Sequence, residues 1–309
     1  MEVKNFNGLV IFQGIVITHP VKIFPGVTIL TIPTIRLLNS STVVAISAGF
    51  RLHIAFLLAG IATRFSPYFA FALIMYATYT LDRALDCKED AINKSELSGA
   101  NRTVGLVACI LAFSAGTVLL FLDGIYLAPF LPFGIGYIYS RGLRIGSFRL
   151  KLKGSLGVKN VIVGITWAGT IALIAGRWCS SVQTIGIIFL FYSMKIFVTS
   201  CVNDFKDVKG DIVAGVRTLP AYLGECRTKE VLLLILAMLY SIMAYAIFFN
   251  MIRDEWIILL FGLVVTTVFL VVYSPSFETS PSVFFRKMRE LVISWESMIS
   301  LGIRACVAG

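Results

Sequence analysis

The chain has 309 residues, of which 58% are hydrophobic and only 14% are charged. Soluble domains are about one quarter charged, so this composition excludes an ordinary soluble protein and predicts an integral membrane protein. The net charge is +10, but the basic residues lie between long apolar runs, which favours a role in membrane orientation over nucleic-acid binding. The six cysteines form no CxxC pair, so neither a disulfide framework nor a zinc site is predicted.

Apolar runs of about 20 residues recur along the chain, and each is long enough to cross a hydrocarbon core of about 30 Å as a helix. The pattern predicts an all-α membrane protein, a bundle of about nine transmembrane helices. We expect residues 1–34 to form an N-terminal lead-in and residues 35–309 to form a single transmembrane domain. The expected helices span 37–60, 66–87, 103–122, 124–142, 157–176, 183–203, 230–250, 255–273 and 289–307.

Basic residues are unevenly divided between the two sets of loops. Twelve follow the second, fourth and sixth expected helices, and three lie in the alternate loops. Loops rich in Lys and Arg stay in the cytoplasm, so the ends of the even-numbered helices are expected there. We therefore predict a multi-pass protein of the plasma membrane whose active site faces the cytoplasm.

Two groups of aspartates lie at the ends of the second and sixth expected helices. At their helical spacing each group lines one helix face, where like charges repel unless a cation neutralises them. Mg²⁺ is suited to this, because it binds carboxylate oxygens and bridges to phosphates. One group alone is compatible with a solvated helix end, but two groups on one membrane face indicate a site. The groups are Asp82, Asp86 and Asp90, and Asp204, Asp207 and Asp211.

The second group carries a family resemblance. The stretch 203–220, NDFKDVKGDIVAGVRTLP, closely resembles the second aspartate motif of the UbiA superfamily of membrane prenyltransferases. The first group, DRALDCKED, resembles the family's N-D-x-x-D-x-x-x-D in its last two aspartates. Asp82 stands where the family has Asn, Arg83 stands where it has its first Asp, and the usual N-x-P-x-R-P tail is absent. Arg36 and Asn39, expected just before the first helix, resemble the family's R-P-x-N.

Further along, Tyr139 and Ser140, with the basic stretch to Lys159 and Asn160, resemble the family's fourth loop. The resemblance covers about residues 35–275. It implies a nine-helix bundle whose cavity is capped by cytoplasmic loops. It also implies Mg²⁺ as the cofactor, with two ions holding the diphosphate of a polyprenyl donor.

The resemblance implies roles for individual residues. Those expected to bind Mg²⁺ are Asp82, Asp86, Asp90, Asn203, Asp204, Asp207 and Asp211, and the catalytic residues among them are Asp86, Asp90, Asp207 and Asp211. Those expected to bind the diphosphate are Arg83, Lys153, Lys159, Lys206 and Arg217. Those expected to line the substrate cavity are Asn39, Tyr139, Ser140, Asn160 and Lys195.

Lys195, Glu296 and Arg304 are among the charged residues inside expected membrane helices, where a charge is costly. Lys195 is eight residues before Asn203, so it can pair with an aspartate, contact substrate or reach the interface. Glu296 and Arg304 are expected to mark an interfacial end of the last helix.

The leading hypothesis is a Mg-dependent transferase that moves a polyprenyl group from an isoprenyl diphosphate to a hydrophobic or aromatic acceptor, such as a quinone or redox-carrier precursor. Transfer to a glycerol-phosphate ether in lipid synthesis is the alternative within this class. A cation transporter is a different reading, although transporter acids usually lie near the bilayer midplane rather than at helix ends. A non-catalytic scaffold of the same fold is a third, raised by the altered first motif. The expected partners are the diphosphate donor, the acceptor and the lipid bilayer, with no nucleic acid.

Overall fold

A computed structural model describes residues 10–12, 15–17, 22–24, 27–28, 32–85, 99–141, 143–145, 148–150, 157–215, 217–274, 277 and 282–308. Three residues with predicted roles lie outside the described residues, namely Asp86, Asp90 and Lys153. The side chains of Tyr139 and Ser140 also lie outside them, although helix α5 contains both residues.

Long helices make up the body of the protein. They are α1 (Ile32–Ala59), α2 (Phe65–Ala84), α4 (Arg102–Leu122), α5 (Phe130–Arg141), α6 (Val158–Ala175), α7 (Val182–Asp204), α10 (Glu225–Phe248), α11 (Trp256–Val272) and α13 (Glu296–Ala308). Shorter elements at the ends of these are α8 (Val208–Ala214), α9 (Leu219–Leu223), α12 (Val283–Glu290) and the π-helix η3 (Leu291–Trp295).

Within the described residues, six strands of two or three residues form three separate antiparallel pairs. The pairs are β1 (Val10–Phe12) with β2 (Ile15–Ile17), β3 (Lys22–Phe24) with β4 (Val27–Thr28), and β5 (Leu143–Ile145) with β6 (Phe148–Leu150).

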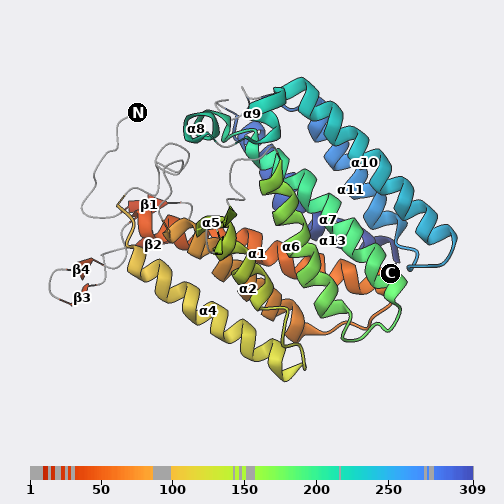
Figure 1. Cartoon of the computed structure of the whole chain (residues 1–309), viewed down its shortest axis with the longest axis horizontal. Coiled ribbons are helices and arrows are strands. Elements are labelled where there is room, and N and C mark those ends of the chain that lie inside the picture. Colours follow the sequence, from red (N-terminus) through yellow and green to blue (C-terminus); the bar gives the residue numbers. More distant parts are fainter. Residues whose placement is uncertain are drawn as a thin grey trace.

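The helices lie side by side in one bundle. In Figure 1, α4 lies on one outer side, α10 and α11 lie on the other, and α1, α6, α7 and α13 lie between them. Among the described residues, five helices have the length and hydropathy to cross a membrane, and α11 is a shorter apolar helix of 17 residues. The prediction of an all-helical membrane bundle is confirmed.

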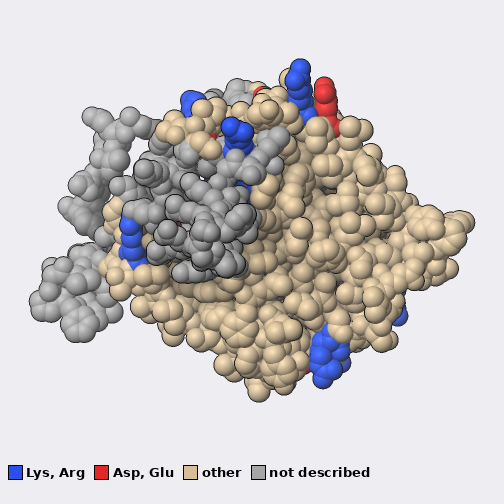
Figure 2. All heavy atoms as spheres, viewed as in Figure 1, with Lys and Arg blue, Asp and Glu red and all other residues tan. Residues whose placement is uncertain are grey.

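The surface has the distribution expected of a membrane protein. Figure 2 shows basic and acidic atoms along the upper and left side of the visible face and again at its lower edge, and the wide area between them holds other residues. Many of the residues on the outside of α4, α10 and α11 are large and apolar, including Leu111, Leu234 and Leu260. Lipid is the solvent that suits such a surface.

Two predicted boundaries were wrong. The fourth helix was expected to begin at 124, but α5 begins at Phe130. Pro129 explains the delay, because the residue before a proline is held away from the helical region. The first helix was expected to begin at 37, but α1 begins at Ile32, so Arg36 lies inside it as Asn39 does, and both are exposed.

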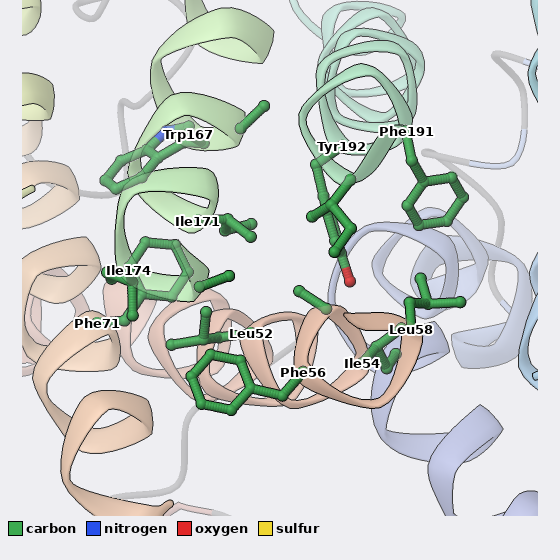
Figure 3. Close-up of a cluster of buried hydrophobic side chains, with 14 of the residues drawn as sticks. Leu52, Ile54, Phe56, Leu58, Phe71, Trp167, Ile171, Ile174, Phe191 and Tyr192 are labelled. Carbon is green, nitrogen blue, oxygen red and sulfur yellow. The ribbon is translucent and has the colours of Figure 1, made fainter. Parts of the chain in front are cut away.

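The bundle is held by a core shared between α1, α2, α6 and α7. Figure 3 shows Leu52 of α1 pointing toward α6, which carries Trp167 and Ile171, with Phe71 of α2 nearby and Phe56 on the other side of α1. All five side chains are buried. With Phe191 and Tyr192 of α7, these side chains join four helices, so the core fixes where the helices end.

Helices α6 and α7 pack against each other through Gly164. A Cβ atom there would lie 2.6 Å from the backbone oxygen of Ser193 on α7. Only a residue without a side chain permits this separation, as in other membrane helix pairs that pack through small residues. The close approach brings the first turn of α6 against the last turn of α7.

We expect Gly164→Ala to destabilise the protein by about 1–3 kcal/mol, the usual range for overpacking a close contact. Gly169, on the same helix, would place its Cβ no closer than 3.5 Å to any neighbour, so Gly169→Ala is the matched control and should leave the thermal unfolding midpoint in detergent unchanged or higher. Equal midpoints for the two variants would contradict the close approach of the helices.

Candidate functional site

Asp82 of the first aspartate motif and all three aspartates of the second motif lie at one end of the bundle. At the opposite end, the turns between the helices meet. The Ser66 hydroxyl donates to the Asp123 carboxylate at 2.7 Å, and the Arg177 guanidinium donates to the carbonyl of Asp123. The backbone amide of Arg253 donates to the carbonyl of Leu58. Helices α2 and α7 begin at that end. Both helices therefore end at the other end of the bundle. Asp82 lies in the last turn of α2, and Asp204 is the last residue of α7.

The chain continues from α7 into α8 with little change of direction. The amide of Asp207 donates to the carbonyl of Asp204, and the amide of Asp211 donates to that of Asp207. Asp207 is the residue that precedes α8, and Asp211 lies within it. This helical path keeps the three carboxylates of the second motif close together along the chain.

Asp204 is the most enclosed of these carboxylates, with 2% of its surface exposed. Lys159 Nζ lies 2.8 Å from Asp204 Oδ1, and Asn160 Nδ2 donates to Asp204 Oδ2 at 2.7 Å. Asn160 Nδ2 also donates to Ser200 Oγ at 3.1 Å. A buried carboxylate is costly unless it is paired and hydrogen-bonded, so the first turn of α6 supplies the charge and the amide that the end of α7 requires.

Burial also affects the other two carboxylates. It raises the pKa of Asp207 above the usual value, against the opposing effect of Lys206 and Lys159. It raises the pKa of Asp211 to about 6, although the Thr218 hydroxyl donates to Asp211 Oδ2 at 3.1 Å and acts in the opposite direction. A raised carboxylate pKa means that the charged form lacks compensation. A cation bound nearby would stabilise the charged form of both carboxylates and lower their pKa.

Arg289 is a residue of this site that the sequence did not predict. It belongs to α12, and its Nη1 donates to Asn203 Oδ1 at 2.5 Å. The only signal available in the sequence was its place in the basic stretch RKMR at 286–289. That stretch lies more than 80 residues from the motif it contacts, and no spacing rule connects the two.

The predicted residues of the first motif are only partly described. Asp82 is exposed at the end of α2. Arg83 Nη1 donates to Ser41 Oγ of α1 at 2.7 Å, and its guanidinium lies 5.7 Å from the ring centre of Tyr79. This basic side chain thus lies between α1 and α2, in the position where the resemblance has an acid.

Three further residues with predicted roles have exposed side chains. Lys206 and Arg217 are exposed beside the second motif, as basic residues that meet a diphosphate could be. Asn39, expected to line the substrate cavity, is exposed on α1. Its place in the substrate cavity stays a prediction.

Lys195 does not reach the aspartates. It lies nine residues before Asp204 on α7, about 13 Å along the helix, and its Nζ is 2.8 Å from Glu296 Oε1 of α13. Glu296 was expected at an interface, which was wrong, because it is 2% exposed. Gly262 of α11 makes room for the pair, since a Cβ there would lie 2.6 Å from Glu296 Oε1. Each charge satisfies the other in a place without water.

A sequence model of the UbiA prenyltransferase family matches residues 37–288, which is most of the chain. The chain belongs to this family. The bacteriochlorophyll synthase 34 kDa chain of Chloroflexus aurantiacus is 31% identical over 147 residues, which span 45% of this chain and 46% of that relative. The match to this curated relative thus covers about half of its length.

Solved structures share the fold of this UbiA family member. A UbiA homologue from Aeropyrum pernix K1 has a TM-score of 0.60 at 11% identity, over 85% of this chain and 98% of that one. A UbiA homologue from Archaeoglobus fulgidus bound to GPP and Mg²⁺ has a TM-score of 0.53 at 14% identity, over 87% of this chain and 99% of that one.

The oxygen donors at the end of α7 suit Mg²⁺. Asp207 and Asp211 offer carboxylates whose charge burial disfavours, and Asn160 Oδ1 is buried without a hydrogen-bond donor among the described residues. Hard oxygen ligands of this kind are those that Mg²⁺ prefers. Within the same residues no three acidic, His or Cys side chains converge into a complete metal site. The predicted ligands Asp86 and Asp90 lie outside them.

Replacing one partner of the buried Lys195–Glu296 ion pair should destabilise this UbiA family member more than replacing both. Lys195→Met or Glu296→Leu alone leaves one buried charge uncompensated, which costs about 3–5 kcal/mol. The double variant removes both charges and should have a higher thermal unfolding midpoint in detergent than either single variant. If the double variant were as unstable as the sum of the two, the pairing of Lys195 with Glu296 would be refuted.

Proposed function

We propose that this UbiA family member transfers a polyprenyl group from its diphosphate to an aromatic acceptor, such as a quinone or redox-carrier precursor, with Mg²⁺ bound at the aspartates. The observation that carries the proposal is the group of enclosed carboxylates at the end of α7, beside Lys159 and Asn160. An acid group at one end of a membrane bundle, surrounded by basic side chains, suits a diphosphate held through divalent ions.

When bound, Mg²⁺ supplies positive charge that stabilises the departing diphosphate. Asp207 and Asp211 of the second motif, with Asp86 and Asp90 of the first, would hold it. Lys159 lies close enough to share this work, since its ammonium already contacts the motif. Its positive charge would favour the pyrophosphate that forms when the bond to the prenyl carbon breaks.

An aromatic wall lies below the motif end of the bundle. Tyr79 of α2 stacks on Trp167 of α6 with ring centres 6.0 Å apart, and Phe71 packs against Trp167 in a T-shaped arrangement with ring centres 5.9 Å apart. Aromatic faces attract cations. We infer that these rings shield the positive charge that develops on the prenyl carbon and keep water from it.

Three classes of acceptor can be compared for this protein. The family supports transfer of a prenyl group, and the relative named as a bacteriochlorophyll synthase adds a bacteriochlorophyll precursor to the acceptors to be tested. Transfer to a glycerol-phosphate ether remains the alternative. A phosphorylated acceptor would require additional cations deep in the bundle. Of the two buried cations described there, Lys195 is already paired with Glu296, and Arg51 donates to the carbonyl of Ile293.

We also propose that the motif end faces the cytoplasm, in the plasma membrane. The concentration of basic residues in the loops of that end supports this orientation. A transporter is not favoured, because Asp82 and Asp204 lie at helix ends rather than at the middle of the bundle.

The purified protein should release pyrophosphate from geranylgeranyl diphosphate when Mg²⁺ and a suitable acceptor are present. The acceptors to be compared are an aromatic quinone precursor, a bacteriochlorophyll precursor and a glycerol-phosphate ether, with product formation followed by mass spectrometry. Activity with the aromatic compound alone supports the proposal, and activity only with the ether establishes the alternative. No Mg²⁺-dependent release with any acceptor would argue against an enzyme.

Asp207→Asn should lower the rate of prenyl transfer by about a hundredfold or more, the order expected when one electrostatic contact to developing charge is lost. Asp254→Asn is the matched control, because Asp254 is an exposed acid in the turn before α11, at the other end of the bundle. The control should be as active as the unmodified protein. Full activity in Asp207→Asn would contradict the proposal that Asp207 binds Mg²⁺.

A further inference from the structure

Helix α12, in the connection between α11 and α13, brings a cation to the second aspartate motif. Arg289 Nη1 donates to Asn203 Oδ1 at 2.5 Å. Asn203 directly precedes Asp204, so the guanidinium lies where the row of three carboxylates begins. Arg289 is half-buried there, and its charge acts on Asp207 together with those of Lys206 and Lys159.

The position of Arg289 is fixed by contacts further along the chain. Glu296, seven residues later, pairs with Lys195, which lies eight residues before Asn203. Asn203 and Lys195 both belong to α7, so the contacts at Arg289 and Glu296 hold both ends of this stretch, which includes the π-helix η3, against that helix. The segment from α12 to α13 therefore runs along α7 with one polar contact at the motif and one in the interior. Arg51 of α1 adds a third, by donating to the carbonyl of Ile293 in η3.

The chemistry of the contact points to an anionic ligand. The bond to the amide oxygen of Asn203 orients the guanidinium beside the second motif, where its charge also acts on Asp207. A guanidinium has five donors in a planar fork that matches the oxygens of a phosphate. Charge-assisted bonds of that kind are about twice as strong as neutral ones. A diphosphate held at Asp207 and Asp211 would therefore compete well for Arg289.

We propose that Arg289 is a further diphosphate-binding residue, which reaches the donor from the connection between α11 and α13. This inference rests on the proposed prenyl transfer and extends it, because the other candidate contacts come from the chain around the two motifs and from the segment before α6. Arg289 would hold the phosphates in the ground state. It would also stabilise the negative charge that grows as the bond from oxygen to the prenyl carbon breaks.

The test compares Arg289→Gln with Arg289→Lys and with a control, Arg227→Gln, which alters an exposed basic residue at the start of α10 on the same end of the bundle. The first readout is the dissociation constant of inorganic pyrophosphate with Mg²⁺, measured by calorimetry on the full chain in detergent. The second is the KM for geranylgeranyl diphosphate beside the KM for the acceptor. The third is the thermal unfolding midpoint without ligand.

Arg289→Gln should weaken pyrophosphate binding and raise the KM of the donor, each by about ten- to a hundredfold, the loss expected for hydrogen bonds to a charged group. The KM of the acceptor and the unfolding midpoint should not change. Arg289→Lys should recover part of the loss, since it keeps the charge without the fork. Arg227→Gln should behave as the unmodified protein does.

Two results would overturn the assignment. Unchanged pyrophosphate affinity in Arg289→Gln is one. The other is a lower unfolding midpoint with equal losses for donor and acceptor, which would show that Arg289 only anchors α12 to α7. A protein that binds pyrophosphate but transfers no prenyl group would contradict the proposed acceptor chemistry while the binding comparison still decides on Arg289. A protein that binds no pyrophosphate would contradict both.

Discussion

The ion pair between Lys159 and Asp204, reinforced by Asn160, is the interaction on which the site depends. It places a carboxylate where almost no water reaches, and it does so by using the first turn of α6 as the counter-charge for the last turn of α7. The two turns can meet because the helices approach closely at Gly164. Helix packing and site electrostatics are thus one constraint, since a small change in the separation of α6 and α7 would leave a buried carboxylate uncompensated.

Helix α7 also organises the C-terminal part of the protein. Lys195 fixes α13 through Glu296, and Asn203 contacts Arg289 of α12. The π-helix η3 lies between these contacts, and short π-helical segments within α-helices are frequent at functional sites. The interior pair lies among apolar side chains, where a single uncompensated charge would be costly. The Lys195–Glu296 pair therefore helps to set the position of α13 along α7, and with it which residue of α12 contacts the second motif.

Much of the fold could be predicted, because the bilayer imposes strong and simple rules on length and hydropathy. The expected helix at 103–122 differs from α4 by one residue, and the expected helix at 183–203 differs from α7 by one at each end. The failures have local causes that hydropathy does not register. Pro129 delayed the start of α5. The first helix begins at Ile32 rather than at 37, because residues 32–36 add a turn that hydropathy alone does not mark.

The sequence by itself determined that this is a membrane bundle, that its acids lie at helix ends on one side, and that 203–220 is a prenyltransferase motif. These features are local in the chain, and periodicity, composition and motif spacing report local features well. The tertiary structure alone decided the partners of the charges. Lys195 meets Glu296 across 101 positions, and Asn203 meets Arg289 across 86. Such pairings depend on how helices pack in three dimensions, and no repeat in the chain encodes that distance.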